Sequence, residues 1–174
     1  MRYSIDPSRS SIWIDARSSV HPIHSEIKNL DGYFEAALDG DNAIDFSKAV
    51  SGRIEVVVNR LASGNPLYDR EMQRRVDARR YPTIDGAIVS MSGDGQPGGH
   101  VTEGDVTFHG VTKRVQDLLR VSTPDEDTVV LEGEHTFDVR DFGVEPPRML
   151  MLRVYPDVTV RLRMVATADR AAGL

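Results

Sequence analysis

The sequence predicts an all-β protein of about eight antiparallel strands, arranged as a sandwich or a barrel, with one amphipathic helix at about residues 66–80. Segments of alternating polar and apolar residues recur along the 174 residues and are separated by glycine- and proline-containing turns. Helical periodicity is convincing in one stretch alone. The alternation does not distinguish a sandwich from a barrel, because both bury one face of each strand.

The strand predictions rest on period-two alternation, which is clearest near the C-terminus. There, Val158, Val160 and Leu162 alternate with polar neighbours. A glycine-rich loop at 93–99 predicts a hairpin, and a polar turn is expected at 123–127. The predicted strands cover residues 11–16, 33–38, 53–61, 84–91, 101–109, 115–121, 128–139 and 158–166.

The helix prediction has a start signal, an apolar face and a stop signal. Asn65 can cap the helix with its side chain, and Pro66 has the φ angle that suits the first helical position. Pro82 is expected to end it, because a residue before proline is disfavoured in the α region. The apolar face consists of Tyr68, Met72 and Val76. A lone amphipathic helix in a β protein suggests a lid or a plug.

Length and charge limit the possible classes of protein. The chain suits a single domain, expected over residues 1–167 with a frayed tail at 168–174. The net charge of −6 argues against a nucleic-acid partner, which needs a basic face. The absence of cysteine excludes disulfides, thiolate metal sites and cysteine nucleophiles.

The first residues enter folded-looking sequence directly, without the apolar segment of a signal peptide. No apolar run approaches membrane-spanning length. A cytoplasmic location and no membrane span are therefore expected, and a periplasmic or secreted location if a leader was removed.

The predicted helix carries an excess of arginine in an acidic protein. Arg75 and Arg79 flank the apolar face, where a guanidinium group could hold a phosphate or carboxylate at the edge of a cavity. Arg140, at the end of a predicted strand, could face the same opening. The alternative is a solvated helix face with weak i, i+4 ion pairs.

Two further clusters keep an enzymatic function open. His21 and His24, in a predicted loop, offer two imidazole ligands for zinc, although the segment lacks a metal-binding motif. An acid–base catalyst could instead use Asp69, His109 or Asp141, provided that an orienting group lies nearby. The structural alternatives are a polar loop, a tight turn at His109 and a strand end after Asp141.

The order of several short motifs resembles the YceI-like family. They are Tyr-Ser-Ile-Asp at 3–6, Leu-Asp-Gly-Tyr-Phe at 30–34, Ser-Gly-Asn at 63–65, Tyr-Pro-Thr-Ile at 81–84, Gly-Asp-Val-Thr-Phe-His-Gly-Val-Thr-Lys at 104–113 and Phe-Asp-Val-Arg-Asp-Phe-Gly at 137–143. Each is weak alone, but together they span nearly the whole chain. The family's usual Phe-x-Val-Arg-His after the first strand is replaced by Ile-Asp-Ala-Arg-Ser at 14–18.

The resemblance implies a lipocalin-like extended barrel that binds a long-chain isoprenoid or another lipid, without a catalytic step or a cofactor, and it favours a homodimer. The residues expected to meet the ligand are Ile12, Ile14, Tyr68, Met72, Arg75, Val76, Arg79, Phe108, Phe137 and Arg140. Two alternatives remain. One is a metal-assisted hydrolase using His21 and His24, and the other is a ligand-free scaffold whose own side chains fill the barrel.

Overall fold

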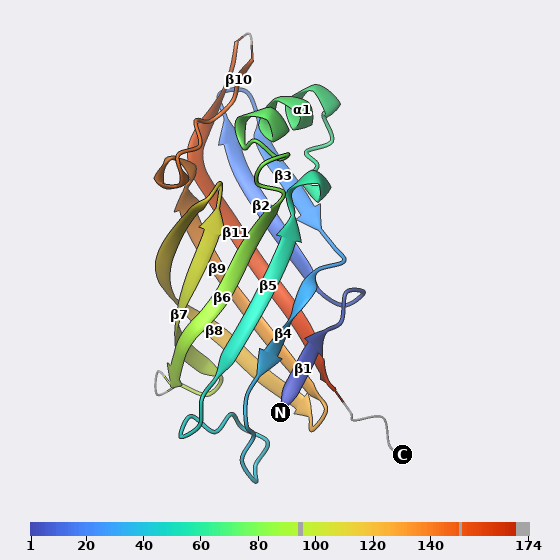
Figure 1. Cartoon of the computed structure of the whole chain (residues 1–174), viewed down its shortest axis with the longest axis vertical. Helices are drawn as coiled ribbons and strands as arrows, with labels where there is room; N and C mark the ends of the chain where they lie inside the picture. Colours follow the sequence, from blue (N-terminus) through green and yellow to red (C-terminus); the bar gives the residue numbers. More distant parts are fainter. Residues whose placement is uncertain (94–95, 150, 170–174) are drawn as a thin grey trace.

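The computed structural model describes residues 1–93, 96–149 and 151–169. These residues form eleven strands, one α-helix and two short 3-10 helices (Figure 1). The strands are β1 (Arg2–Ile5), β2 (Ser11–Ser18), β3 (Pro22–Ile27), β4 (Asp31–Glu35), β5 (Ser51–Val57), β6 (Thr83–Gly93), β7 (Gly99–Phe108), β8 (Val111–Asp125), β9 (Thr128–Asp138), β10 (Arg148–Met149) and β11 (Leu152–Ala168). The helices are η1 (Val58–Arg60), α1 (Pro66–Arg75) and η2 (Val139–Phe142).

Eight of the strands form a closed antiparallel barrel. Neighbours follow the order β1-β4-β5-β6-β7-β8-β9-β11, and β1 pairs with both β4 and β11. Because the first and last strands of this series are themselves paired, the ring is complete. The prediction of an all-β barrel of about eight strands with one helix is confirmed, and the choice left open between sandwich and barrel is decided.

β11 is long enough to take two successive neighbours along one edge. Its residues 166–168 pair with β1, whereas residues 154–163 pair with β2. β2 pairs in turn with β3, which has no second strand partner in the described part of the chain. The backbone ring is therefore closed at the β1 end, and it is interrupted beside β3 at the end where α1 lies (Figure 1).

Alternation along the strands separates the barrel interior from the solvent. In β9, Val129 and Leu131 are fully buried, while Glu132 and Glu134 are exposed. The interior at the β1 end is filled by large side chains, including the fully buried Tyr3 and Phe34. This end of the barrel is consequently a packed core.

Three strands were missing from the sequence prediction, and one of them replaces a predicted loop. Residues 21–24 were expected to be a loop, but Pro22 begins β3, with Ile23 and Ile27 buried on its inner face. Proline is tolerated at the first residue of an edge strand, where no ladder hydrogen bond is lost. The short strands β1 and β10 were also missed.

Several predicted strand ends were wrong by a few residues. The segment predicted at 33–38 is strand only to Glu35, and the one predicted at 53–61 turns into η1 after Val57. β8 is longer than predicted and continues through Pro124. The expected turn at 123–127 is therefore confined to its last two residues.

The helix begins where predicted but ends five residues early. Asn65 accepts hydrogen bonds from the backbone N–H groups of Leu67 and Tyr68, and Pro66 is the first helical residue. The end is set by Asp77, whose left-handed φ of 47° reverses the chain so that its N–H bonds the carbonyl of Arg74. Pro82 lies beyond this turn and does not end the helix.

The remaining turns agree with the sequence. His109 and Gly110 both have positive φ and form the tight turn between β7 and β8. Gly143 ends η2 with a φ of 71°, as expected for a glycine that permits an unusual dihedral angle. β11 continues to Ala168, the first residue of the segment expected to be frayed, and residues 170–174 lie outside the described residues.

Candidate ligand-binding cavity

The barrel contains a cavity of about 380 Å³ between its packed end and α1. Its wall is almost wholly apolar and includes residues of β2, β3, β5 to β9, β11, α1 and η2. Cavities that hold small molecules in proteins have volumes of roughly 300–1,000 Å³. The volume and the composition of the wall are therefore suitable for an apolar ligand.

Several inward-facing positions of the cavity wall lack a side chain. Four glycines on the inner faces of β5, β6, β7 and β9 line it, namely Gly52, Gly86, Gly104 and Gly133. A Cβ atom at Gly133 would lie 2.3 Å from a methyl carbon of Leu119, so this position leaves no room for a side chain. At Gly133 the side chain of Leu119 therefore occupies the space that a larger residue would need.

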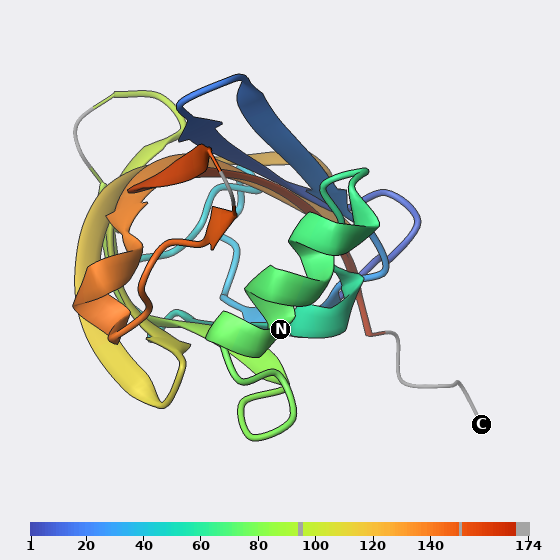
Figure 2. The same ribbon diagram turned by 90° about the horizontal axis from the view of Figure 1, so that it is seen from above.

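Helix α1 covers one side of the end of the barrel, and η2 lies on the other side of the same end (Figure 2). Tyr68, Met72 and Val76 all line the cavity, so the predicted apolar face of the helix is directed inward. Burial raises the pKa of Tyr68 to about 12, which keeps its hydroxyl group neutral. α1 is therefore placed as a lid with an apolar underside.

Beside α1, the wall is completed by contacts other than strand pairing. Ser25 in β3 donates its hydroxyl to the carbonyl of Ala62 at 2.6 Å and accepts from the N–H of Ala62 at 3.2 Å. Ser25, Ala62 and Ser63 also line the cavity. Because side-chain contacts rather than strand pairing join β3 to this segment, we expect the wall to open here more easily than between paired strands.

Aromatic side chains close the opposite side of the same end. Phe142 of η2 is buried, and its ring lies 5.8 Å from that of Phe108 and 6.0 Å from that of Phe137. The carbonyl oxygen of Phe142 accepts a hydrogen bond from Nδ1 of His109 at 3.0 Å. The Asp-Phe-Gly segment therefore places a phenylalanine plug over the cavity.

One polar pair interrupts the apolar wall. Asp117 of β8 and His135 of β9 line the cavity and are joined by a hydrogen bond from His135 Nδ1 to Asp117 Oδ2. The His135 ring also packs against Phe137, with ring centroids 4.4 Å apart. Both side chains are about one-third exposed, with 32% for His135 and 37% for Asp117. They are therefore accessible while lining the cavity wall.

The sequence predictions for the apolar part of the site match the cavity wall. The predicted ligand-binding residues that line it are Ile12, Ile14, Tyr68, Met72, Val76, Phe108 and Phe137. Their contact with a ligand stays a prediction.

The three predicted arginines do not lie in the cavity wall. Arg75 donates to Glu71 at 2.8 Å, Arg140 is paired with Asp138 at 2.6 Å, and Arg79 is exposed. Because the guanidinium groups of Arg75 and Arg140 already contact carboxylates, an anionic ligand would have to compete for them. Their role at the opening stays a prediction.

The histidines considered for a metal site lie on the outside of the barrel. His24 is exposed and bonds Asp15 through Nδ1 at 2.5 Å, while Nδ1 of His21 contacts the carbonyl of Pro22 at 2.9 Å. The described residues contain no group of three or more histidine, aspartate or glutamate side chains arranged to hold a metal ion. Within the described residues, the two histidines therefore have no third metal ligand of these types beside them.

The residues considered for acid–base catalysis have structural partners or lie in solvent. Asp69 accepts from the N–H and the hydroxyl of Ser63 at 2.8 and 2.6 Å, which ties α1 to the segment before it. His109 bonds a backbone carbonyl rather than a carboxylate, and Asp141 is exposed. The three side chains therefore do not form a catalytic arrangement.

The sequence prediction missed Asp117 and His135 as site residues, although the signal was present. Asp117 alternates in phase with Leu119 and Val121, and His135 alternates in phase with Leu131. A polar residue at an inward position of each of two neighbouring strands indicates a polar pair inside the barrel. The strand register that joins them could not be obtained from the sequence.

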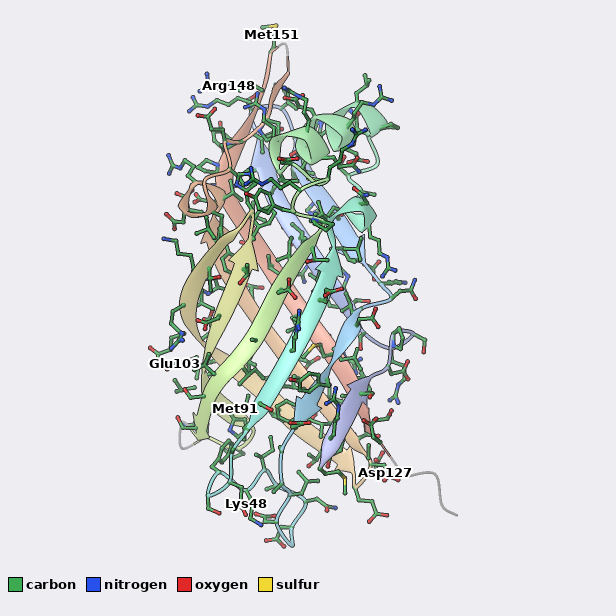
Figure 3. All side chains as sticks on the ribbon, in the orientation of Figure 1. Lys48, Met91, Glu103, Asp127, Arg148 and Met151 are labelled. Atoms are coloured by element: carbon green, nitrogen blue, oxygen red, sulfur yellow. The ribbon has the colours of Figure 1, made fainter. Side chains whose placement is uncertain are left out.

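The two ends of the barrel differ in the side chains that they present. Met151, in the turn between β10 and β11, is 93% exposed and lies with Arg148 at the end that carries α1 (Figure 3). Lys48 and Asp127 lie at the opposite end (Figure 3).

Within the described residues, no helix has the length and apolar composition needed to cross a bilayer.

Comparison with known proteins supports the fold. A family model described as a YceI-like domain matches residues 3–166. No curated protein matches the sequence significantly.

Solved structures with low sequence identity have a similar fold. BcnA of Burkholderia cenocepacia aligns with a TM-score of 0.76 at 17% identity, over 94% of this chain and 99% of BcnA. A polyisoprenoid binding domain from Saccharophagus degradans, implicated in plant cell wall breakdown, aligns with a TM-score of 0.70 at 12% identity, over 96% and 98%. A YceI protein of Campylobacter jejuni aligns with a TM-score of 0.59 at 14% identity, over 83% and 88%.

Proposed function

Because this chain belongs to the YceI-like family, we propose that its barrel binds one elongated apolar molecule, a polyisoprenoid or another lipid chain, for storage, transport or sequestration. The observation that carries the proposal is the apolar cavity beneath α1. The similar domain from Saccharophagus degradans, described as polyisoprenoid binding, supports the class of ligand. The YceI-like family is not a known enzyme family, so binding without catalysis agrees with the membership.

The energetics favour a long chain over a short one. Each buried methylene group contributes about 0.8 kcal/mol, so about 12 of them contribute about 10 kcal/mol. Association itself costs roughly 4–15 kcal/mol in lost translational and rotational freedom. A short hydrocarbon therefore binds weakly, and a chain that fills the cavity is needed for a stable complex.

Native mass spectrometry of the purified protein tests the proposal. We expect a mass increase that disappears after extraction with organic solvent and returns when a polyprenyl chain is added. A protein that carries no extractable lipid and takes up no added chain would favour the ligand-free scaffold instead. The same spectra report the oligomeric state, for which the homodimer stays a prediction, as does the cytoplasmic location.

A further inference from the structure

The pair formed by Asp117 and His135 lies on the inner face of the barrel wall. In β8, Asp117 has the same orientation as Leu119 and Val121, which pack in the core. In β9, His135 has the same orientation as Leu131 and Phe137. Both members of the pair therefore project into the cavity that the proposed ligand would fill.

The strand register places Asp117 and His135 opposite residues of β7 and β11 that also line the cavity. His135 lies directly across from Val160 of β11, which in turn lies across from Ile14 of β2. On the other side, Asp117 lies across from Thr102 of β7. All five residues line the cavity, so a ligand chain that fills it passes them.

The pair keeps hydrogen-bonding capacity that the protein does not use. The bond between the two side chains occupies Nδ1 of His135 and Oδ2 of Asp117. Within the described residues, neither Nε2 of His135 nor Oδ1 of Asp117 has a hydrogen-bond partner in the protein. Both side chains are partly exposed within the cavity wall, so a ligand can reach these two atoms and gains affinity if it supplies a hydrogen-bond partner.

Stability alone gives little reason for a polar pair at this place. Even a fully charged pair that is partly exposed contributes little to stability in most proteins. An apolar pair would also suit a pure hydrocarbon ligand better. The register between β8 and β9 covers Arg120 to Asp125 of β8, so the side-chain bond lies beyond it and also links the two strands, while its place in the cavity wall makes the pair available to a polar group of a ligand.

Nε2 of His135 and Oδ1 of Asp117 together favour a hydroxyl group of the ligand as their partner. With a neutral imidazole, Nε2 and the carboxylate oxygen both accept, and with a protonated imidazole Nε2 donates. A hydroxyl group can donate and accept, so it bonds both atoms when the imidazole is protonated and one of the two acceptors when the imidazole is neutral. A phosphate or carboxylate would place its negative charge beside that of Asp117, which is unfavourable in an apolar cavity.

We propose that Asp117 and His135 form a polar subsite that binds the hydroxyl group of a neutral apolar alcohol inside the barrel. This inference rests on the proposed function, because it specifies the ligand that the same cavity takes. It differs from capture of an anionic head group by arginines at the opening. The subsite selects an uncharged alcohol and disfavours its phosphorylated form.

Three matched probes test the subsite: farnesol, the hydrocarbon farnesene and farnesyl phosphate. Each competes with a fluorescent apolar dye, N-phenyl-1-naphthylamine, for the intact protein. We expect the protein to bind farnesol about tenfold more tightly than farnesene, which corresponds to one net hydrogen bond to a charged group of about 1.4 kcal/mol. Farnesyl phosphate should bind at least tenfold more weakly than farnesol.

The variant Asp117→Leu/His135→Phe should reduce the ratio between farnesol and farnesene at least fivefold and leave farnesene binding intact. Solubility differences between the probes cancel, because the ratio is compared between proteins. The chain offers a matched control in Asp15 and His24, the same residue types paired across β2 and β3 on the outer face. Asp15→Leu/His24→Phe should leave the ratio unchanged.

The outcomes separate this inference from the proposed function. If the wild type binds farnesene and farnesol equally well, or prefers farnesyl phosphate, the subsite proposal is wrong while apolar binding stands. If no probe displaces the dye, both proposals fail. Circular dichroism establishes that Asp117→Leu/His135→Phe folds. Asp117→Asn serves as a second variant that keeps the size of the side chain, and a reduced ratio between farnesol and farnesene is again expected. An unchanged ratio in folded variants overturns the subsite.

Discussion

At the scale of single residues, the titration of Tyr68 reports on the burial of the lid. Its pKa is raised to about 12 from 10.0, first by burial and then by the nearby charge of Asp69. The neutral phenol is therefore favoured in the folded protein relative to the unfolded chain. Its contribution to stability is fully present below about pH 10 and is lost as the pH rises to about 12.

Tyr68→Phe should remove this part of the alkaline destabilisation. We expect the free energy of unfolding to fall less between pH 10 and 12 in the variant than in the wild type, by at most about 2.7 kcal/mol for a two-unit shift. Urea unfolding at a series of pH values measures the difference. Tyr155→Phe, at a more exposed ring, is the control for loss of a phenol. Equal slopes in Tyr68→Phe and the wild type would contradict the burial of the hydroxyl group.

At the scale of elements, the sequence predicted what local chemistry determines. The start of α1 follows from the cap at Asn65 and the proline after it, and the long strands follow from their alternation. The end of α1 was wrong because Asp77 adopts a left-handed conformation that its residue type permits but does not require. The short strand β1 was missed because its four residues carry too little alternation to be recognised.

In the candidate site, too, the features set by local sequence were predicted and those set by long-range contacts were not. Apolar lining residues such as Ile14 and Phe108 were predicted, because alternation identifies the inner face of a strand. The pairing of Asp117 with His135 depends on the register between β8 and β9, and the engagement of Arg140 by Asp138 depends on the turn into η2. Neither follows from residue spacing alone.

The cap of α1 gives a prediction for the lid as an element. Asn65→Ala removes the acceptor of two backbone N–H groups and should destabilise the helix by about 1 kcal/mol. Amide hydrogen exchange in α1 should become about fivefold faster, while exchange in the barrel strands stays unchanged. Gln73→Ala, on the same helix, is the control. Faster exchange throughout the barrel would show that α1 does not open independently.

At the scale of the whole molecule, the fold combines a rigid wall with an incompletely filled interior. Closure through β1 leaves no free edge at the packed end, whereas the other end is covered by α1, η2 and side-chain contacts. An unfilled apolar cavity lowers stability, because its lining atoms lack packing partners. A bound ligand should therefore stabilise the complete barrel rather than α1 alone.

Because filling the cavity stabilises the whole barrel, an apolar ligand should strongly raise the free energy of global unfolding. A ligand at 100 times its Kd should raise the free energy of unfolding by about 2.7 kcal/mol, visible as a higher midpoint in urea. Val160→Phe places a ring in the cavity and should reduce this gain by lowering the affinity. Thr159→Phe, which adds the same ring at the neighbouring outward position, should keep the gain. If the ligand stabilises the wild type and Val160→Phe equally, the ligand binds outside the barrel, and the cavity beneath α1 is not its site.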